Sequence, residues 1–432
     1  MAAEIHDIDE KFVFTPKLKK TIFTVLGIGV AALVIGMLIA AFGGGHAEHA
    51  AEGGEHHAFH WTTKLWASMW VNNVYFTGIA LIGIFFVAIQ YIASAGWSAS
   101  ILRIPATFGY FLPVAFVLTL IVFAIANRDL FHWTHTYLYD KTSPEFDSIL
   151  FGKRGYFFIP GAEEASHIPY FYYLRLVAFF AIWMIMFRLI RKETLKEDVN
   201  GGIGHYKKLV KFSGAFLVFF GLSSSVAAWD WVMSIDPHWY STMFGWYVFA
   251  SWFVSGLAAI TLILVLLKDA GYLKIVNENH LHDMGKFVFA FSIFWTYIWF
   301  SQFLLIYYSN IPEEGIYFVE RLKSDIYSKY IFLNLIFNFF FPFLVLMTRD
   351  AKRKSIILKV VCIVVLVGHW FDFFLMVHPG TLKENGGFGF MEIGLTMIYL
   401  AVFVYIALNQ LSKVPLIAKN HPMLEESIHH HT

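Results

Sequence analysis

The stretch GHWFDFFLMVHPG, from Gly368 to Gly380, places a histidine and a carboxylate inside an apolar run that begins near Ile356. His369 and Asp372 are three residues apart, so in a helix they lie on one face. An ionised carboxylate inside a membrane costs a few kcal/mol unless a partner or water compensates it. A coupled His–Asp pair of this kind suits acceptance of a proton from a quinol, or a proton exit path. The structural alternative is that His369 caps a carbonyl group and Asp372 holds an outer loop.

A second acidic stretch repeats this spacing. DWVMSIDP begins at Asp230 and DFFLMVHP begins at Asp372, and in each stretch the Asp lies seven residues before a Pro. Asp230 has Ala227 where Asp372 has His369, and tryptophans flank it, which also fits an interfacial, hydrogen-bonded Asp. The two stretches are four spans apart, which predicts two parallel four-helix units. The alternative is that membrane spans simply tend to end in Asp and Pro.

Other polar residues are scattered through the apolar runs. Asn334 and Asn338 share a helix face, and uncharged groups of this kind often only bridge helices, for about 1 kcal/mol each. Arg175 either extends to the membrane interface or pairs with an acid. Glu392 is a better candidate for a proton path than the neutral groups, because a carboxylate can carry a proton. Besides His369, Asp372 and Asp230, the candidates for a quinone or proton path are Asp236, Glu392, Ser301 and Gln302.

The elements that must position these residues are apolar helices. The chain has 432 residues, of which 58% are hydrophobic and 15% are charged, a composition that a soluble protein of this length does not need. A membrane helix requires ~20 apolar residues, and the runs here are continuous rather than alternating, unlike the strands of a β-barrel. The sequence predicts an all-α, polytopic membrane protein with ten transmembrane helices, at approximately 21–42, 69–93, 108–127, 170–190, 210–232, 242–267, 286–309, 329–348, 355–377 and 388–411.

Orientation follows from the basic residues. Lys and Arg favour the loops on the side of the N-terminus by roughly two to one, which predicts that both termini are cytoplasmic. The repeat predicts two four-helix bundles plus two flanking helices. The corresponding division is 1–65 (cytoplasmic N-terminus, first helix and His-rich outer loop), 66–240 (first bundle with the large outer loop 128–169), 241–380 (second bundle) and 381–432 (last helix and cytoplasmic tail).

Composition also argues against several classes of cofactor. The single cysteine, Cys362, cannot hold an iron–sulfur cluster or a covalent haem. His369 is the only histidine well inside a predicted span, so a haem carrier is not expected. Gly and Ala separate the His and Glu residues of segment 46–60, which favours a polar tether over a metal site. A net charge of +1 gives no indication of nucleic acid, and no phosphate-binding loop is present. The sequence predicts no catalytic residue, no metal ligand and no covalent cofactor.

Two long runs carry a resemblance to a known family. HDMGKFVFAFSIFWTYIWFSQFLLIYYSNIPEE (282–314) and AAWDWVMSIDPHWYSTMFGWYVFASWFVSG (227–256) resemble the ActF family, membrane subunits of bacterial alternative complex III, a quinol:cytochrome c oxidoreductase. ActF and its sister ActC are similar to NrfD-type membrane proteins. The resemblance extends over spans 2 to 10, is specific in these two runs, and implies two four-helix bundles with flanking helices.

The resemblance also implies a cellular location, partner subunits and ligands. It implies the bacterial inner membrane, a respiratory chain, and a role in proton conduction or quinone association without a redox centre in this chain. The implied partners are ActC, multihaem cytochrome c subunits, an iron–sulfur subunit, membrane lipids and a terminal oxidase, and the implied non-covalent ligands are quinone and bound phospholipid.

Two other functions fit the same residues. A secondary transporter would also show repeats and buried carboxylates, but such proteins often break their helices near mid-membrane, and spans 5, 7 and 9 lack a central Pro. A purely structural scaffold would use its polar residues only to hold helices together.

Overall fold

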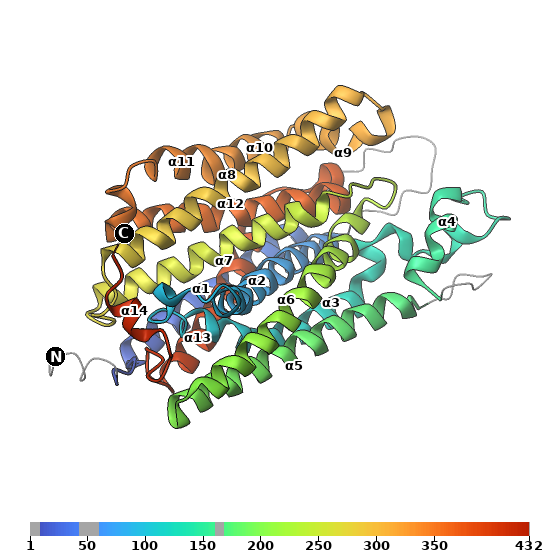
Figure 1. Ribbon diagram of the computed structural model, residues 1–432. Coiled ribbons are helices and arrows are strands. Elements are labelled where there is room, and N and C mark those ends of the chain that lie inside the picture. The colour runs from blue at the N-terminus through green and yellow to red at the C-terminus, as the bar shows by residue number, and fades with distance from the viewer. Residues whose placement is uncertain (1–8, 43–59, 160–167, 432) are drawn as a thin grey trace.

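The computed structural model describes residues 9–42, 60–159 and 168–431. Within these ranges the chain is helical and contains no β-strand. Ten helices there are long and apolar enough to cross a membrane. They pack side by side along a common axis and form an elongated bundle (Figure 1). The prediction of an all-α, polytopic membrane protein is confirmed. The His-rich segment 46–60 lies almost wholly outside the described residues.

The membrane-length helices follow one another in alternating directions. Each forms because a chain inside a membrane must satisfy its backbone hydrogen bonds within the segment itself. In chain order they are α1 (Pro16–Phe42), α2 (Trp61–Ile92), η3 (Pro105–Phe111) with α3 (Leu112–Leu130), α5 (Tyr170–Asn200), α6 (Ile203–Trp231), α7 (Phe244–Asp269), α8 (Glu278–Ser309), α10 (Ser328–Leu335) with η7 (Ile336–Phe340) and α11 (Phe341–Val345), α12 (Ser355–Leu382) and α13 (Phe390–Leu411).

Eight of these spans pack as two rings of four. In the first ring, α2 contacts α3, α3 contacts α5, α5 contacts α6, and α6 returns to α2. In the second ring, α7 contacts α8, α8 contacts α11, and α12 contacts both α10 and α7. The rings meet where α2 contacts α7 and α12. Because α2 and α7 lie in this central layer, most of their residues are buried. This arrangement agrees with a two-bundle architecture, although the domain boundaries themselves remain predictions.

The flanking helices α1 and α13 pack closely against each other. A Cβ atom added to Gly36 of α1 would lie 2.5 Å from the backbone nitrogen of Met391, and one added to Gly394 of α13 would lie 2.7 Å from the carbonyl oxygen of Gly29. Small residues at such contacts let two membrane helices approach backbone to backbone. From Val25 onward α1 is apolar and most of its residues are not buried, as expected for a helix surrounded by lipid.

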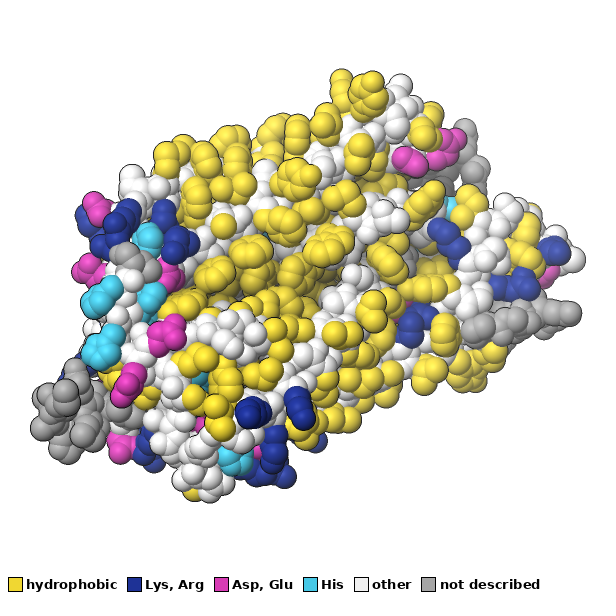
Figure 2. All heavy atoms as spheres, viewed as in Figure 1, with side chains coloured by type: hydrophobic (Ala, Val, Ile, Leu, Met, Phe, Trp, Pro, Cys, Tyr) yellow, Lys and Arg dark blue, Asp and Glu magenta, His cyan; other side chains and the backbone are white. Residues whose placement is uncertain are grey.

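The surface has an apolar belt between two polar ends. Figure 2 shows hydrophobic side chains along the length of the helices, with Lys, Arg, Asp and Glu gathered toward the ends. Large apolar residues are freely exposed on this belt, including Val218 and Leu222, each 70% exposed. A soluble protein would bury such a surface, so the belt is the part that contacts lipid.

Several helices extend beyond the predicted spans. α2 begins at Trp61 rather than near residue 69, and α8 begins at Glu278 rather than near residue 286. The added turns carry polar residues that other parts of the chain cover, so hydropathy alone does not detect them. The predicted boundary at 65/66 falls inside α2, and the boundary at 380/381 falls inside the last turn of α12.

The N- and C-terminal segments lie together at one end of the bundle (Figure 1). Lys11 forms an antiparallel bridge with Pro415, and the Leu416 amide donates to the Glu10 carbonyl oxygen at 2.9 Å. The short helix α14 (Leu424–Ile428) packs at the same end. The opposite end carries α4 (Ser148–Phe157) and α9 (Pro312–Leu322), which belong to the long loops 128–169 and 310–328. Both terminal segments therefore lie on one side of the membrane, and the cytoplasmic assignment of that side remains a prediction.

The C-terminal segment contains a buried histidine that should make stability depend on pH. Burial and the nearby Arg103 lower the pKa of His421 to about 4. Its Nδ1 accepts a hydrogen bond from the Met423 amide at 3.2 Å, which requires an unprotonated nitrogen. Because the unfolded chain binds a proton near pH 6.5, the stability that neutral His421 contributes is present above that value. It should fall by about 3 kcal/mol as pH drops to 4.

The measurement is the unfolding midpoint in detergent between pH 7 and pH 4, for the wild type and for His421→Asn. Asn keeps a hydrogen-bond acceptor but does not titrate in this range. The wild type should lose more stability than the variant on acidification. Parallel profiles for the two proteins would show that His421 does not couple protonation to folding.

Candidate functional site

Asp372 lies fully buried in α12 and accepts hydrogen bonds from three helices of the second ring. The Tyr247 hydroxyl of α7 donates to its Oδ1, and so does Asn334 Nδ2 of α10, at 2.8 Å. Trp295 Nε1 of α8 donates to Oδ2 at 2.9 Å. Each of the four spans of the ring thus contributes one side chain to this carboxylate cluster, and all the donors are neutral groups.

His369 lies one turn away on the same face of α12. Its Nδ1 is 3.9 Å from Asp372 Oδ2 and 3.0 Å from the Ser251 hydroxyl of α7. Its ring stands perpendicular to the Trp295 indole, with ring centroids 5.4 Å apart. Its Nε2 is buried and has no hydrogen-bond partner among the described residues. The structural alternative of a carbonyl cap and a loop anchor does not describe this arrangement, because both side chains contact side chains of neighbouring spans.

Local sequence explains how the neighbours reach the cluster. Tyr247 and Ser251 are four residues apart in α7, so one helix face presents a hydroxyl to Asp372 and another to His369. On the other side, Asn338 Nδ2 donates to Asn334 Oδ1, which orients the Asn334 amide so that its NH₂ group points at Asp372. Two polar pairs at helical spacing therefore support one buried carboxylate.

A π-helical turn, η7, lies beside the cluster and breaks the regularity of the eighth span. The Phe341 amide bonds the Ile336 carbonyl, five residues earlier. Pro342 explains the change, because it has no N–H to give to the carbonyl of Asn338. Such π-helical turns occur frequently at functional sites. Asn338 lies in this turn and is fully buried.

Gly368 allows η7 to approach α12 closely. A Cβ atom at this position would meet Asn338 Oδ1 and would lie 2.7 Å from Phe337 Cβ. Gly368→Ala should therefore separate the two helices or displace the Asn338 amide. We expect it to cost about 1–3 kcal/mol of stability and to lower the unfolding midpoint in detergent.

Gly221→Ala is the matched control for this test. Gly221 lies inside α6 with nothing within 4 Å of its added Cβ, so Ala should be neutral or stabilising there through its higher helix propensity. If Gly368→Ala were tolerated as well as Gly221→Ala, the close contact between η7 and α12 would not hold in the native protein.

The electrostatic setting of the cluster favours proton exchange over a permanent ion pair. Among the described residues, no Lys or Arg forms an ion pair with Asp372. Its charge is stabilised only by hydrogen bonds and by His369, whose protonation would add an opposite charge nearby. Asp372 and His369 are each able to take up a proton, although their 3.9 Å separation is longer than a direct hydrogen bond.

Asp230, at the corresponding place in the first ring, has a different partner. Arg175 of α5 binds it through two parallel contacts, Nε to Oδ2 at 2.7 Å and Nη2 to Oδ1 at 2.8 Å. Arg175 Nη1 also donates to the Tyr156 carbonyl, and its guanidinium lies over the Tyr156 ring at 4.1 Å. Of the two outcomes expected for Arg175, pairing with an acid is the one observed. A bidentate ion pair with Arg keeps Asp230 charged and held in place.

Asp236 lies near the end of the bundle that carries α9. Its Oδ2 accepts from Arg321 Nη2 of α9 at 3.1 Å. The same Arg321 lies over the Tyr317 ring at 3.4 Å and donates from Nε to the Leu375 carbonyl of α12 at 2.9 Å. A Cβ atom added to Gly380 would lie 2.5 Å from Asp236 Oδ1. Asp236 therefore helps to attach α9 to the end of α12.

Glu392 lies in the first turn of α13 and is fully buried. It accepts from the Ser68 hydroxyl at 3.0 Å and from the Gly389 amide at 2.8 Å, and lies 3.6 Å from Lys64 Nζ. Ser68 also lies 3.5 Å from His378 Nε2. His378 is fully buried and lies in α12 four residues before its end at Leu382, so His369 is not the only buried histidine in this helix. Glu392 and His378 form a second polar group, separate from Asp372.

The two neutral candidates contribute little to either group. Gln302 Oε1 accepts from the Ser241 hydroxyl at 3.0 Å, which links α8 to the segment before α7. The Ser301 hydroxyl forms a hydrogen bond within its own helix, donating to the Tyr297 carbonyl at 2.7 Å. Of the seven sequence candidates, the structure brings together only His369 and Asp372.

The residues that sequence reasoning missed are Tyr247, Trp295 and Ser251. Tyrosine and tryptophan are so frequent in these spans that neither stands out. The spacing of Tyr247 and Ser251 is the signal that could have identified them, since a polar pair four residues apart marks an inward face in an apolar helix. Among the described residues, no three His, Cys, Asp or Glu side chains are grouped as a metal site would need.

The chain matches no protein-family model, and comparison with curated proteins finds no relative.

Proposed function

We propose that this chain is a membrane subunit of a quinol:cytochrome c oxidoreductase of the alternative complex III type, similar to ActF, in a bacterial inner membrane. In this proposal the chain handles protons, and partner subunits carry the electrons. The partners are ActC, multihaem cytochrome c subunits and an iron–sulfur subunit, with a terminal oxidase downstream. The proposal rests on the resemblance of two runs of sequence and on one structural observation, the buried Asp372 cluster.

The contrast between the two rings supports a proton role for Asp372. Asp230 and Asp372 occupy corresponding places, but Arg175 neutralises Asp230 permanently, whereas Asp372 has only neutral donors and His369. A carboxylate whose partner is a fixed cation cannot easily exchange its proton. The second ring is therefore the half of the molecule in which a proton can be held and released.

Within this proposal, binding of a quinone at Asp372 is the alternative to proton handling. Asp372 has no exposed surface, and three side chains already occupy its hydrogen-bonding positions. A quinone ring that reached Asp372 would have to displace Tyr247 or Trp295. Passage of a proton requires only rotation of hydroxyl groups and movement of His369, so the packing favours proton handling.

A secondary transporter remains the second candidate, and η7 is the observation that favours it. Transporters often place irregular helical segments beside a buried site near mid-membrane. The π-helical turn at Ile336–Phe340 has that position relative to Asp372. A transporter would bind its substrate in the isolated chain, whereas the oxidoreductase subunit acts only in its complex.

Purification of the tagged chain from its native membrane separates these proposals. The oxidoreductase proposal expects c-type haem absorbance and quinol:cytochrome c reductase activity to copurify, with no chromophore in the isolated chain. Substrate uptake by the isolated chain in liposomes, without copurifying haem, would replace this proposal with the transporter. If substitution of His369 and Asp372 by Asn or Leu changed neither turnover nor proton release, only the scaffold function would remain.

A further inference from the structure

A second polar layer lies inside the second ring, one helical turn away from Asp372. Each of the four spans contributes one side chain to it, namely Ser251 of α7, Ser292 of α8, Asn338 of η7 and His369 of α12. All four side chains are fully buried. We call this set the His369 layer. Polar groups at this depth require partners, which makes their hydrogen bonding informative.

Spacing along the helices places the four side chains at one level. Each lies three or four positions, about one turn, from a residue of the Asp372 cluster: Ser251 follows Tyr247, Ser292 precedes Trp295, Asn338 follows Asn334, and His369 precedes Asp372. The spans α8 and α12 run toward the end of the bundle that carries α9, whereas α7 and the α10–η7–α11 span run away from it. All four steps therefore lead toward the end that holds the terminal segments.

Three atoms of this layer have no hydrogen-bond partner among the described residues. They are His369 Nε2, Ser292 Oγ and Asn338 Oδ1. The other atoms of these side chains are engaged. His369 Nδ1 lies 3.0 Å from Ser251 Oγ, and Asn338 Nδ2 donates to Asn334 Oδ1. Because buried polar groups in native proteins bond either to protein or to an ordered water, three unpaired atoms from three helices point to a shared small ligand.

The packing of the ring brings these atoms toward its interior. The His369 ring stands edge-on against the Trp295 indole, with centroids 5.4 Å apart, so it lies beside α8, which carries Ser292 one turn earlier. Asn338 Oδ1 lies against the backbone of α12, because a Cβ atom added to Gly368 would meet it. The π-helical turn η7 contacts α8 as well as α12. The three helices thus contact one another in pairs, and one small molecule can bridge them.

The chemistry of the three atoms fits a water molecule. Asn338 Oδ1 only accepts, the Ser292 hydroxyl donates or accepts, and His369 Nε2 does either one according to its tautomer. Water does both, so it satisfies the set with either tautomer. A buried water typically makes about three hydrogen bonds. Hard cations such as Ca²⁺ require roughly six to eight oxygen ligands, and the described residues contain no His, Cys, Asp and Glu grouping that could hold a metal ion.

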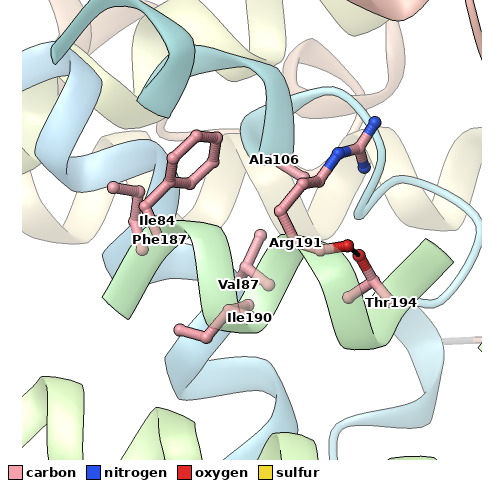
Figure 3. Close-up of a pocket in the computed structure, with 7 residues that line it drawn as sticks. All are labelled: Ile84, Val87, Ala106, Phe187, Ile190, Arg191 and Thr194. Atoms are coloured by element: carbon pink, nitrogen blue, oxygen red, sulfur yellow. Dashed lines mark hydrogen bonds between the residues drawn. The ribbon is translucent and has the colours of Figure 1, made fainter. Parts of the chain in front are cut away.

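A recess elsewhere in the molecule does not offer such partners. Figure 3 shows this recess between α2, η3 and α5, where Ile84, Val87 and Phe187 lie together and the guanidinium of Arg191 points away from them. Thr194 Oγ1 donates to the Arg191 carbonyl of its own helix at 2.8 Å. Apolar walls give a water no hydrogen bonds. The His369 layer is therefore the better place for an internal water.

We propose that the His369 layer binds a water molecule held by His369 Nε2, Ser292 Oγ and Asn338 Oδ1. The water joins α8, η7 and α12 through one set of hydrogen bonds. It also holds the edge of the imidazole that faces away from Ser251, which positions His369 beside Asp372. This inference does not depend on the proposed respiratory function.

A high-resolution density map of the intact chain in lipid discs tests the site directly. The wild type should show a peak within hydrogen-bonding distance of the three atoms, and Ser292→Ala should lose it. Thr261→Val is the matched control, because Thr261 is a fully buried hydroxyl of α7 that donates only to the Leu257 carbonyl of its own helix. It should keep the peak. A wild-type map that resolves other buried waters but has no peak here would overturn the proposal.

The sign of the stability change in Ser292→Ala gives an independent test. If the hydroxyl holds a water, its loss leaves His369 and Asn338 less well satisfied, and the unfolding midpoint in detergent should fall by a few degrees relative to Thr261→Val. If the hydroxyl has no ligand, Ala removes a costly buried group and is the better helix former, so the midpoint should rise. A rise would therefore contradict the water site.

Two further measurements locate the ligand and identify it. Ser292→Ala and Asn338→Leu should be non-additive, with the double variant losing less than the sum of the two single losses, because both residues hold the same water. Strictly additive losses would show that they share no ligand. The wild-type midpoint should be equal in sodium, potassium and choline chloride. A rise specific to sodium or potassium would assign the site to a cation and overturn the assignment to water.

Discussion

Replacement of Asp372 by Asn should reduce quinol oxidation by the intact complex about 100-fold, the range expected when a positioned proton-transfer group is lost. Asn has nearly the same shape, but it cannot take up or release a proton at this position. The chain should still insert and assemble, because most contacts of α12 do not involve this side chain. The measurements are quinol:cytochrome c turnover and proton release in membranes that contain equal amounts of the complex.

The same substitution should also lower stability. Asp372 accepts from Tyr247, Trp295 and Asn334, and an Asn side chain offers only one oxygen in place of two. Whichever way the amide points, its NH₂ group faces at least one N–H donor. We expect a cost of about 1–3 kcal/mol, and more for Asp372→Leu, which leaves all three donors unpaired.

Ser301→Ala is the control for both effects. The Ser301 hydroxyl donates only to carbonyl groups of its own helix, so its removal should change neither turnover nor stability. Wild-type turnover and proton release in Asp372→Asn would contradict a proton role for the cluster. In that case the three hydrogen bonds would serve only to join α7, α8, α10 and α12.

Breaking the Arg175–Asp230 pair should produce the second large effect, on stability. Arg175→Gln leaves Asp230, which is 2% exposed, as a buried carboxylate without a cation. Removing one partner of a buried pair typically costs 3–5 kcal/mol, because the remaining charge is no longer compensated. The unfolding midpoint in detergent should fall accordingly, as should the amount of folded chain in the membrane.

A double-mutant cycle tests the physical reason for this loss. Arg175→Gln combined with Asp230→Asn removes both charges, so the double variant should be more stable than Arg175→Gln alone. It should also keep quinol turnover, in contrast to Asp372→Asn. Loss of turnover in a stable double variant would show that the first ring contributes to proton handling and would contradict the assignment of that role to the second ring.

The fold was largely predictable from hydropathy. Ten apolar runs, each long enough to span, correspond to the ten membrane-length helices of the described chain. The ends of the helices were less predictable. α12 continues through His378 and Pro379 to Leu382, since the surrounding helices bury the polar groups in its last turns. The π-helical turn at η7 is explained by Pro342, but a proline alone does not specify which form of irregularity a helix adopts.

The candidate site was predictable only in part. His369 and Asp372 stood out because charge is costly in an apolar run, and their separation of three residues places them on one face of α12. Asp230 stood out for the same reason. Yet the sequence also favoured Glu392 and offered Asp236, Ser301 and Gln302 as candidates, and the structure disperses these four residues over different contacts. A single sequence does not tell whether a polar residue meets a cation, a neutral donor or its own backbone.

The sequence by itself determined that this chain is a helical membrane protein and which of its helices carry buried charge, because both follow from the cost of transferring apolar and charged groups between water and lipid. The partners of each charge were decided only by tertiary structure. In one ring, Arg175 of α5 pairs with Asp230 of the neighbouring helix α6. In the other ring, Tyr247, Trp295 and Asn334 contact Asp372 from three different helices. These contacts join residues 38 to 125 positions apart, and hydropathy and local spacing carry no information about which distant helices pack together.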